Sequence, residues 1–186
     1  MKKPDETELA RGYSVARYRR LEAAKNKKAI ANLLSRRFTE RYLAPTLAKR
    51  NIRHGFTSMA VACLMVEALE SFQQGWVDTR DRSKDAFRFF FNAHNQFSPF
   101  RSRAERFYYD VRCGILHQAE TRGGWKIRRK GPLLDGERTV NATAFLRTLG
   151  RVLKAYCRHL VQEDWESDLW KKCRKKMNAI CTACVS

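Results

Sequence analysis

Arg112 and His117 are the two residues of this sequence whose types and spacing best suit a chemical role. They lie five positions apart within "FYYDVRCGILHQAETRGGW", residues 107 to 125, where the apolar spacing predicts one helix. Histidine titrates near neutral pH and can give or accept a proton, whereas arginine stays charged and offers a planar fork to phosphate oxygens. Metal-free cleavage of RNA needs both abilities, because a proton must leave the ribose 2′-hydroxyl, another must reach the leaving oxygen, and the charge on phosphorus must be held.

The helix that must position this pair is predicted over residues 103 to 121 and carries two apolar faces. At about 100° per residue, one narrow stripe faces the core. Its members are Ala104, Phe107, Tyr108, Val111, Ile115 and Ala119. Arg112 and His117 bracket a different face, which contains Tyr109, Cys113 and Leu116. Because both charged residues lie off the core stripe, their substitution is expected to leave stability nearly unchanged.

A second protein surface would cover the apolar side chains of that second face. Self-complementary two-fold pairing is the commonest way to do so. The sequence therefore predicts a homodimer with Tyr109, Cys113 and Leu116 in its interface. Such a dimer would bring two arginines and two histidines into one cleft.

Other interpretations of the same residues stay open. Arg112 could pair with Glu67 or Glu70 on another helix, with His117 as a packing histidine. The protein could also bind RNA without cleaving it, using Arg112 only to hold phosphate. A third possibility is a basic interaction protein that docks on a larger partner through residues 14–43.

The net charge points to a polyanionic partner. Lysine and arginine number 38 against 19 acids, which gives a formal net charge of +19. Such an excess concentrates nucleic acid near the surface, and RNA is the expected partner. The segment after the pair is expected to grip the strand through Lys126, Arg128, Arg129 and Lys130. Trp125 would either stack on a base or seal the end of the bundle.

The remaining elements predict an all-α fold in a single domain over residues 1–186. A long basic helix is expected over 14–43, stopped by Pro45, and a C-terminal amphipathic helix over 165–186. Between them, 54–164 would form a four-helix bundle core. Its helices cover residues 56–75, a segment capped by Ser83, the helix of Arg112, and a helix that Asn141 caps. Glycines from 123 to 136 predict a loop or short β-hairpin, with strands at 125–129 and 138–140.

Composition gives no sign of a membrane, a metal or a cofactor. No apolar run reaches the ~20 residues that span a bilayer, and no secretory signal is visible, so a cytoplasmic protein without a membrane partner is expected. The six cysteines are expected to be free thiols. Cys181 and Cys184 form a C-x-x-C pair, but the second pair that a zinc site needs is missing from the sequence.

The R-x4-H spacing of "RCGILH", on the next-to-last core helix of a helical bundle, resembles the catalytic motif of the HEPN superfamily. The resemblance covers residues 54 to 164. Members of this superfamily are typically four-helix-bundle, metal-independent endoribonucleases that act as homodimers. Many belong to toxin–antitoxin, CRISPR or antiphage systems.

This resemblance implies specific roles for the pair. Arg112 would bind the scissile phosphate, and His117 would be the acid or base. A toxin, antiphage-defence or stress role is implied as well, with an antitoxin or another defence-system protein as a partner. The sequence departs from the family pattern at two positions. Cys113 stands where many active members carry a polar residue, and Ala119 stands where nucleotidylated members carry tyrosine.

Overall fold

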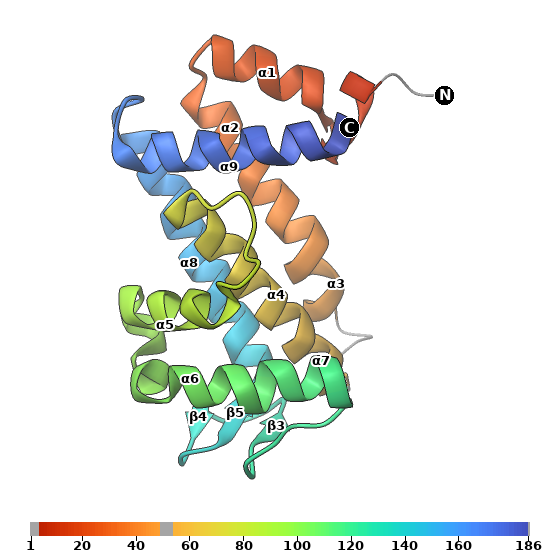
Figure 1. Cartoon of the computed structure of the whole chain (residues 1–186), viewed down its shortest axis with the longest axis vertical. Helices are drawn as coiled ribbons and strands as arrows, with labels where there is room; N and C mark the ends of the chain where they lie inside the picture. The colour runs from red at the N-terminus through yellow and green to blue at the C-terminus, as the bar shows by residue number, and fades with distance from the viewer. Residues whose placement is uncertain (1–3, 49–53, 186) are drawn as a thin grey trace. The chain divides into compact units, whose positions relative to one another are not determined.

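The computed structural model describes residues 4–48 and 54–185, and the chain is mostly helical (Figure 1). Helices hold 72% of the residues and strands 7%, which confirms the predicted helical character. Two small sheets are also present. Residues 1–3, 49–53 and 186 of the predicted ranges lie outside the described residues.

The chain divides into two compact units. The terminal unit comprises Met1–Arg41, Ser71–Asp78 and Leu153–Ser186, and the central unit comprises Tyr42–Glu70 and Thr79–Val152. These boundaries differ from the predicted core over 54–164 with two appended helices. The two ends of the chain instead share a core of their own.

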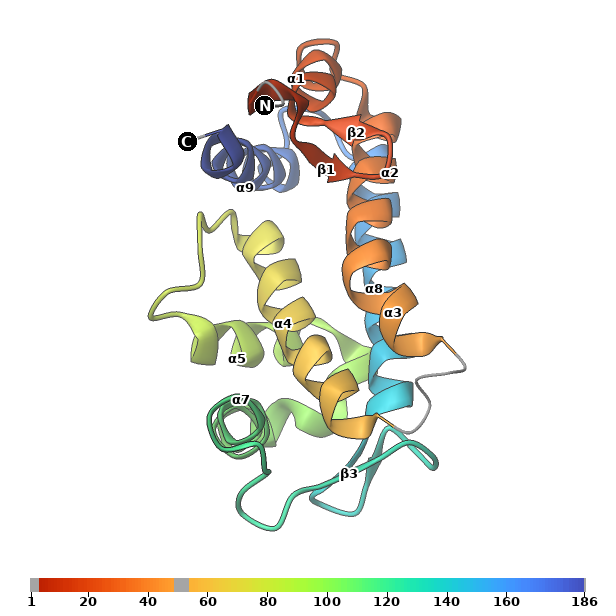
Figure 2. The same cartoon turned by 90° about the vertical axis from the view of Figure 1, so that its right-hand side faces the viewer.

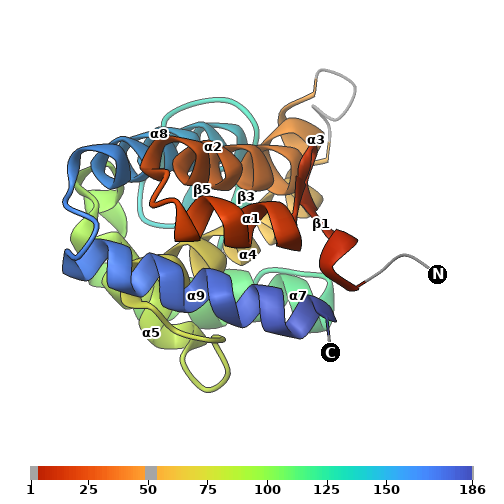
Figure 3. The same cartoon turned by 90° about the horizontal axis from the view of Figure 1, so that it is seen from above.

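The terminal unit is built from α1 (Val15–Ala23), α2 (Lys27–Phe38), α9 (Asp168–Val185) and the last part of α8 (Ala142–Gln162). Figure 3 shows α1 and α9 side by side, and the Asn178 amide on α9 donates to Glu22 on α1 at 3.0 Å. Figure 2 shows α2 alongside α8. Apolar side chains from all these helices are fully buried, among them Val15, Tyr18, Ile30, Leu33, Leu34, Leu160, Trp170, Cys173 and Met177.

The prediction of one long helix over 14–43 is wrong. Lys25 adopts a left-handed backbone with φ 50°, and the Asn26 side chain then caps α2 by accepting from the Ala29 N–H at 3.0 Å. Pro45 does not stop the helical path either. It lies in the first turn of α3 (Ala44–Leu47), where a missing N–H costs nothing.

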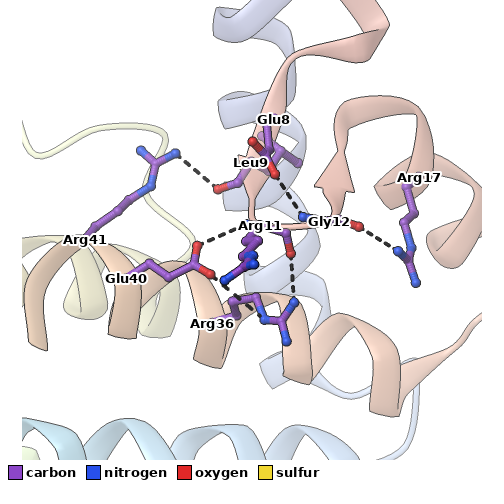
Figure 4. Close-up of polar contacts among 8 residues, drawn as sticks. All are labelled: Glu8, Leu9, Arg11, Gly12, Arg17, Arg36, Glu40 and Arg41. Carbon is purple, nitrogen blue, oxygen red and sulfur yellow. Dashed lines mark hydrogen bonds and ion pairs between the residues drawn. The ribbon is translucent and has the colours of Figure 1, made fainter. Parts of the chain in front are cut away.

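Several arginines of this basic region bind the protein's own backbone (Figure 4). Strands β1 (Glu8–Ala10) and β2 (Tyr13–Ser14) form a short hairpin whose carbonyls accept from them. The donors are Arg17 to Gly12 at 2.6 Å, Arg36 to Arg11 at 2.9 Å, Arg37 to Leu9 at 2.7 Å and Arg41 to Leu9 at 3.1 Å. Part of the basic region predicted to dock on a larger partner therefore also holds this hairpin, while Arg36 keeps a side chain that is 51% exposed.

The central unit packs around phenylalanine rings. It contains most of α4 (Gly55–Gln74), α5 (Ser83–Ala93), a 3-10 segment (Asn95–Arg103) and the first part of α8. It also contains the motif helix, which is the continuous run of α6 (Ala104–Arg106), a π-helical stretch (Phe107–Cys113) and α7 (Gly114–Gln118). The buried ring cluster comprises Phe87, Phe90, Phe91, Phe97, Phe100, Phe107 and Phe145.

A three-stranded sheet follows the motif helix (Figure 1). Its strands are β3 (Lys126–Arg128), β4 (Leu134–Asp135) and β5 (Thr139–Asn141). The two predicted runs form β3 and β5, but these pair in parallel and do not make a hairpin. Between β3 and β5 in the sequence, turns at Gly131 and Gly136, both with positive φ, flank the additional strand β4. Strand β4 pairs antiparallel with β5.

Candidate active site

The motif helix changes its winding at the candidate pair. Arg112 lies in the π-helical stretch, and His117 lies in α7. Of the predicted core stripe, Phe107 and Val111 are buried, whereas Ala119 is exposed because the helix ends before it. Single π-helical turns are frequent at functional sites.

A tight reversal ends the helix two residues after His117. Ala119 adopts a left-handed backbone with φ 56°, and its N–H donates to the Gly114 carbonyl. The chain then crosses so close to Gly114 that a Cβ there would lie 2.5 Å from the Glu120 carbonyl oxygen. Glycine at position 114 is therefore required by the path of the following loop.

The loop returns along the motif helix toward Trp125. Gly123, with φ +58°, lies against Asp110, and the Arg122 N–H donates to the Asp110 carbonyl at 2.9 Å. Trp125 is 4% exposed, and its ring meets Phe107 edge-on at 5.5 Å. The alternative in which Trp125 seals the bundle end describes the structure, whereas base stacking by this buried ring does not.

Arg112 is held by a carboxylate from α4. Its Nε donates to Glu67 Oε1 at 2.8 Å, and its Nη2 lies 3.5 Å from Oε2. The two side chains are only 16% and 7% exposed. Glu67 also accepts from the Ser83 hydroxyl at 2.6 Å and from the Thr79 hydroxyl at 3.4 Å. Of the two partners left open by the sequence, Glu67 is the one that pairs with Arg112.

The surroundings keep this guanidinium charged. Burial lowers the pKa of Arg112, but the hydrogen bond and charge of Glu67 outweigh it and hold the pKa above its ordinary value. The Tyr108 ring lies 5.6 Å from the Arg112 Cζ. Burial, followed by a hydrogen bond with Cys113, raises the pKa of Tyr108, so its hydroxyl stays protonated.

His117 has a different setting from Arg112. Its side chain is exposed, and within residues 4–48 and 54–185 it makes no hydrogen bond or ion pair. A packing histidine would be covered and bonded, so that alternative does not describe His117. The pair thus combines a fixed cation with a free imidazole.

The apolar residues between them are largely open to solvent. Tyr109 is 47% exposed and Leu116 is 38% exposed, while Cys113 is half-buried. Tyr109 and Leu116 are among the exposed large hydrophobic side chains of the described residues. The face predicted for dimerisation is therefore exposed in the single chain.

The four basic residues after the motif helix do not share one surface. Lys126 and Arg128 are exposed on β3, and Arg128 lies 3.8 Å from Asp135. Arg129 donates to the Ser58 hydroxyl on α4 and, with Lys130, lines a cavity. Sequence reasoning missed two further cations of that cavity, Arg147 and Arg151, although their i, i+4 spacing on α8 places them on one helix face.

Two further observations bear on cofactors and membranes. Within the described ranges no group of three or more His, Cys, Asp or Glu side chains could hold a metal ion, and all six cysteines are free. Helix α4 is long and apolar enough to cross a bilayer by length and composition, but 61% of that window is buried within the protein.

No family model matches this chain, and no curated protein or solved structure is significantly similar to it.

Proposed function

We propose that this protein is a metal-independent endoribonuclease of the HEPN type, which cleaves RNA through the 2′-hydroxyl at a site shared by two copies of the chain. Its setting would be a toxin, antiphage-defence or stress response in the cytoplasm. The observation that carries the proposal is the exposed, unbonded His117 five residues after an arginine whose guanidinium is already fixed.

The Glu67 contact suits Arg112 for binding phosphate. A guanidinium has five N–H donors, and Glu67 takes only those on the Nε–Nη2 edge. Because Ser83 and Thr79 hold the carboxylate, the arginine does not need to be ordered when RNA arrives. A preorganised donor of this kind stabilises charge that develops on a phosphate in the transition state.

The exposed imidazole suits proton transfer. An unbonded His117 is free to reach a ribose hydroxyl or a leaving oxygen, and general acid–base catalysis of this kind contributes about 10² to 10⁴ in rate. One chain supplies a single histidine at this site, whereas the reaction needs two proton transfers. A two-fold partner packed on Tyr109 and Leu116 would supply the second histidine and cover both side chains.

The test is RNA cleavage by His117→Ala. We expect loss of cleavage by about 100-fold or more, with an unchanged melting temperature, because the exposed His117 side chain makes no hydrogen bond or ion pair among the described residues. His159→Ala, on the exposed surface of α8, is the matched control and should cleave normally. Wild-type cleavage should continue in EDTA, and its products should end in 2′,3′-cyclic phosphate.

Two results would contradict the mechanism. If a substrate with 2′-deoxyribose at the scissile position were cleaved as fast as the all-ribose substrate, the 2′-hydroxyl could not be the nucleophile. Full activity of His117→Ala would remove the proposed acid or base. RNA binding without any cleavage by the wild-type protein would favour the non-catalytic RNA-binding module.

A further inference from the structure

The central unit contains a cavity of about 690 Å³ that the proposed reaction does not use. Four cationic side chains line it: Arg129 and Lys130 after β3, and Arg147 and Arg151 on α8. Apart from Leu133, the rest of its wall is polar or small. None of its lining residues, which include Gln96, Asn141, Thr143 and Thr148, is acidic. A cavity with this lining attracts anions.

The positive charge of this cavity is not balanced by the fold. None of the four cations lies within ion-pair distance of a carboxylate in the described part of the chain. Arg147 and Arg151 lie one turn apart on the same face of α8 and repel each other. Burial, followed by the charge of Arg147, lowers the pKa of Arg129. A bound anion would relieve this repulsion.

Two hydrogen-bond donors at the cavity are also without a partner. The Nε of Arg129 and the hydroxyl of Thr143 are buried and unbonded among the described residues. Buried polar groups without a partner are rare in folded proteins. Thr143 also lies in the first turn of α8, whose N-terminus has a partial positive charge. The helix N-terminus therefore adds positive potential to that of the four cations, and two of the lining residues carry buried donors that no protein group uses.

This cavity is separate from the candidate active site. Arg129 contacts Ser58 on α4, whereas Arg112 contacts Glu67 on the same helix. Nine residues are two and a half helical turns, so these two contacts lie on opposite faces of α4 and about 14 Å apart along its axis. A ligand in the cavity would not replace the phosphate held by Arg112.

We propose that the cavity binds a ligand through two or more linked phosphate groups, as in a nucleoside di- or triphosphate or the triphosphate end of an RNA. One phosphate ester carries about −1.5 to −2 charges at neutral pH, so two or more are needed to balance four cations. The cavity's 690 Å³ lies within the range of small-molecule sites. Gln96 and Leu133 offer amide and apolar surface for the remainder of such a ligand.

The direct test is calorimetric titration of the full chain with inorganic tripolyphosphate. We expect saturable binding, weakened about tenfold or more by Arg147→Gln and by Arg151→Gln, since each removes a charge-assisted contact. Arg158→Gln is the matched control, because it removes the same charge from an exposed position on α8 outside the cavity lining. Its affinity should equal that of the wild type.

A second variant tests the site by adding a charge. Ala144 lines the cavity in the first turn of α8, where a glutamate favours the helix. Ala144→Glu should place a carboxylate beside the arginines, so that tripolyphosphate binding is lost while the melting temperature of the free protein rises. Loss of binding through misfolding would instead lower that temperature.

Further titrations identify the source of the phosphates. Displacement of tripolyphosphate by ATP or GTP would identify a free nucleotide, and displacement by a 5′-triphosphorylated but not a 5′-hydroxyl oligoribonucleotide would identify an RNA end. Three results would overturn the proposal: no binding of tripolyphosphate, equal weakening by Arg158→Gln, or inorganic phosphate binding as tightly as tripolyphosphate. Because the site lies apart from Arg112 and His117, these outcomes are independent of the cleavage assays.

Discussion

Arg112 contacts Glu67 in the folded protein and would contact phosphate in the proposed reaction, so its substitution has two effects that must be separated. From the sequence, a position off the core stripe is expected to be neutral for stability. The structure corrects this expectation, because removal of Arg112 leaves the Glu67 carboxylate, 7% exposed, without its cation.

We therefore expect Arg112→Ala to lower the free energy of unfolding by about 2 to 3 kcal/mol. This is less than the ~3–5 kcal/mol typical of broken buried pairs, because Ser83 still donates to Glu67. Replacing both partners, with Arg112→Met and Glu67→Leu, should restore stability to within about 1 kcal/mol of the wild type. Urea unfolding followed by circular dichroism measures both effects.

Cleavage separates the two roles of this arginine. The double variant is expected to fold well and to cleave no RNA, since it lacks the guanidinium that would hold the scissile phosphate. Recovered cleavage in the double variant would show that Arg112 acts only through the stability of the fold. The sequence could name Arg112 and His117, but it could not choose between Glu67 and Glu70, because that choice depends on how α4 is rotated against a π-helical turn.

At the scale of elements, the sequence predicts helices well where apolar spacing and end signals agree. The observed α4 and α8 match their predicted ranges closely, with Gly75 at φ +67° after one and Asn141 capping the other. The sequence predicts Ser83 as the N-cap of a helix, and a helix, α5, does begin at this residue. Arg82 occupies the cap position, and the Ser83 hydroxyl instead donates to Glu67.

Other features of the elements depend on contacts that periodicity does not contain. The break at Lys25 and Asn26 falls among charged and polar residues, where no apolar stripe marks it. The parallel pairing of β3 with β5 depends on a strand inserted between them in sequence. The cavity cations Arg147 and Arg151 meet Arg129 only through the fold.

The loop after the motif helix gives a prediction at this scale. Gly114→Ala should destabilise the protein by about 2 kcal/mol or more, because the new methyl would lie 2.5 Å from the Glu120 carbonyl oxygen. Gly150→Ala is the matched control within α8, where the methyl would make an ordinary 3.4 Å contact with Leu43. That change should stabilise the protein by about 0.5 to 1 kcal/mol. Thermal unfolding of both variants checks the opposite signs, and equal effects would contradict the close approach at Gly114.

At the scale of the whole molecule, net charge is a sum over residues and is known from the sequence without a structure. The distribution of that charge over the surface, by contrast, depends on the fold. Arg36, Arg37 and Arg41 bind carbonyls of the β1–β2 hairpin, whereas Arg147 and Arg151 face an open cavity without acidic partners among the described residues. The excess of +19 therefore favours polyanion capture in general, while particular sites depend on which cations the fold leaves unpaired.

The composite site makes a prediction about mixtures of two inactive proteins. The Arg112→Met, Glu67→Leu double variant lacks the phosphate-binding arginine, and His117→Ala lacks the proton-transferring histidine. If two copies share one cleft, a mixed dimer combines His117 of one protomer with Arg112 of its partner. That cleft holds only one histidine, so one of the two proton transfers lacks its side chain. Cleavage should therefore return only in part on mixing, above the rate of either protein alone and below that of the wild type. It should be greatest at equal amounts, as measured by the initial rate across mixing ratios.

Blocking the pairing face should abolish this recovery. Leu116→Glu, introduced into both inactive proteins, would place two carboxylates in a desolvated interface and keep the chains apart. Val161→Glu is the matched control, since Val161 is 40% exposed on α8 and Leu116 is 38% exposed on the motif helix. Mixtures with Val161→Glu should still recover. A wild-type protein that light scattering shows to be monomeric while it cleaves RNA, together with mixtures that never recover, would contradict the shared site and assign both proton transfers to one His117.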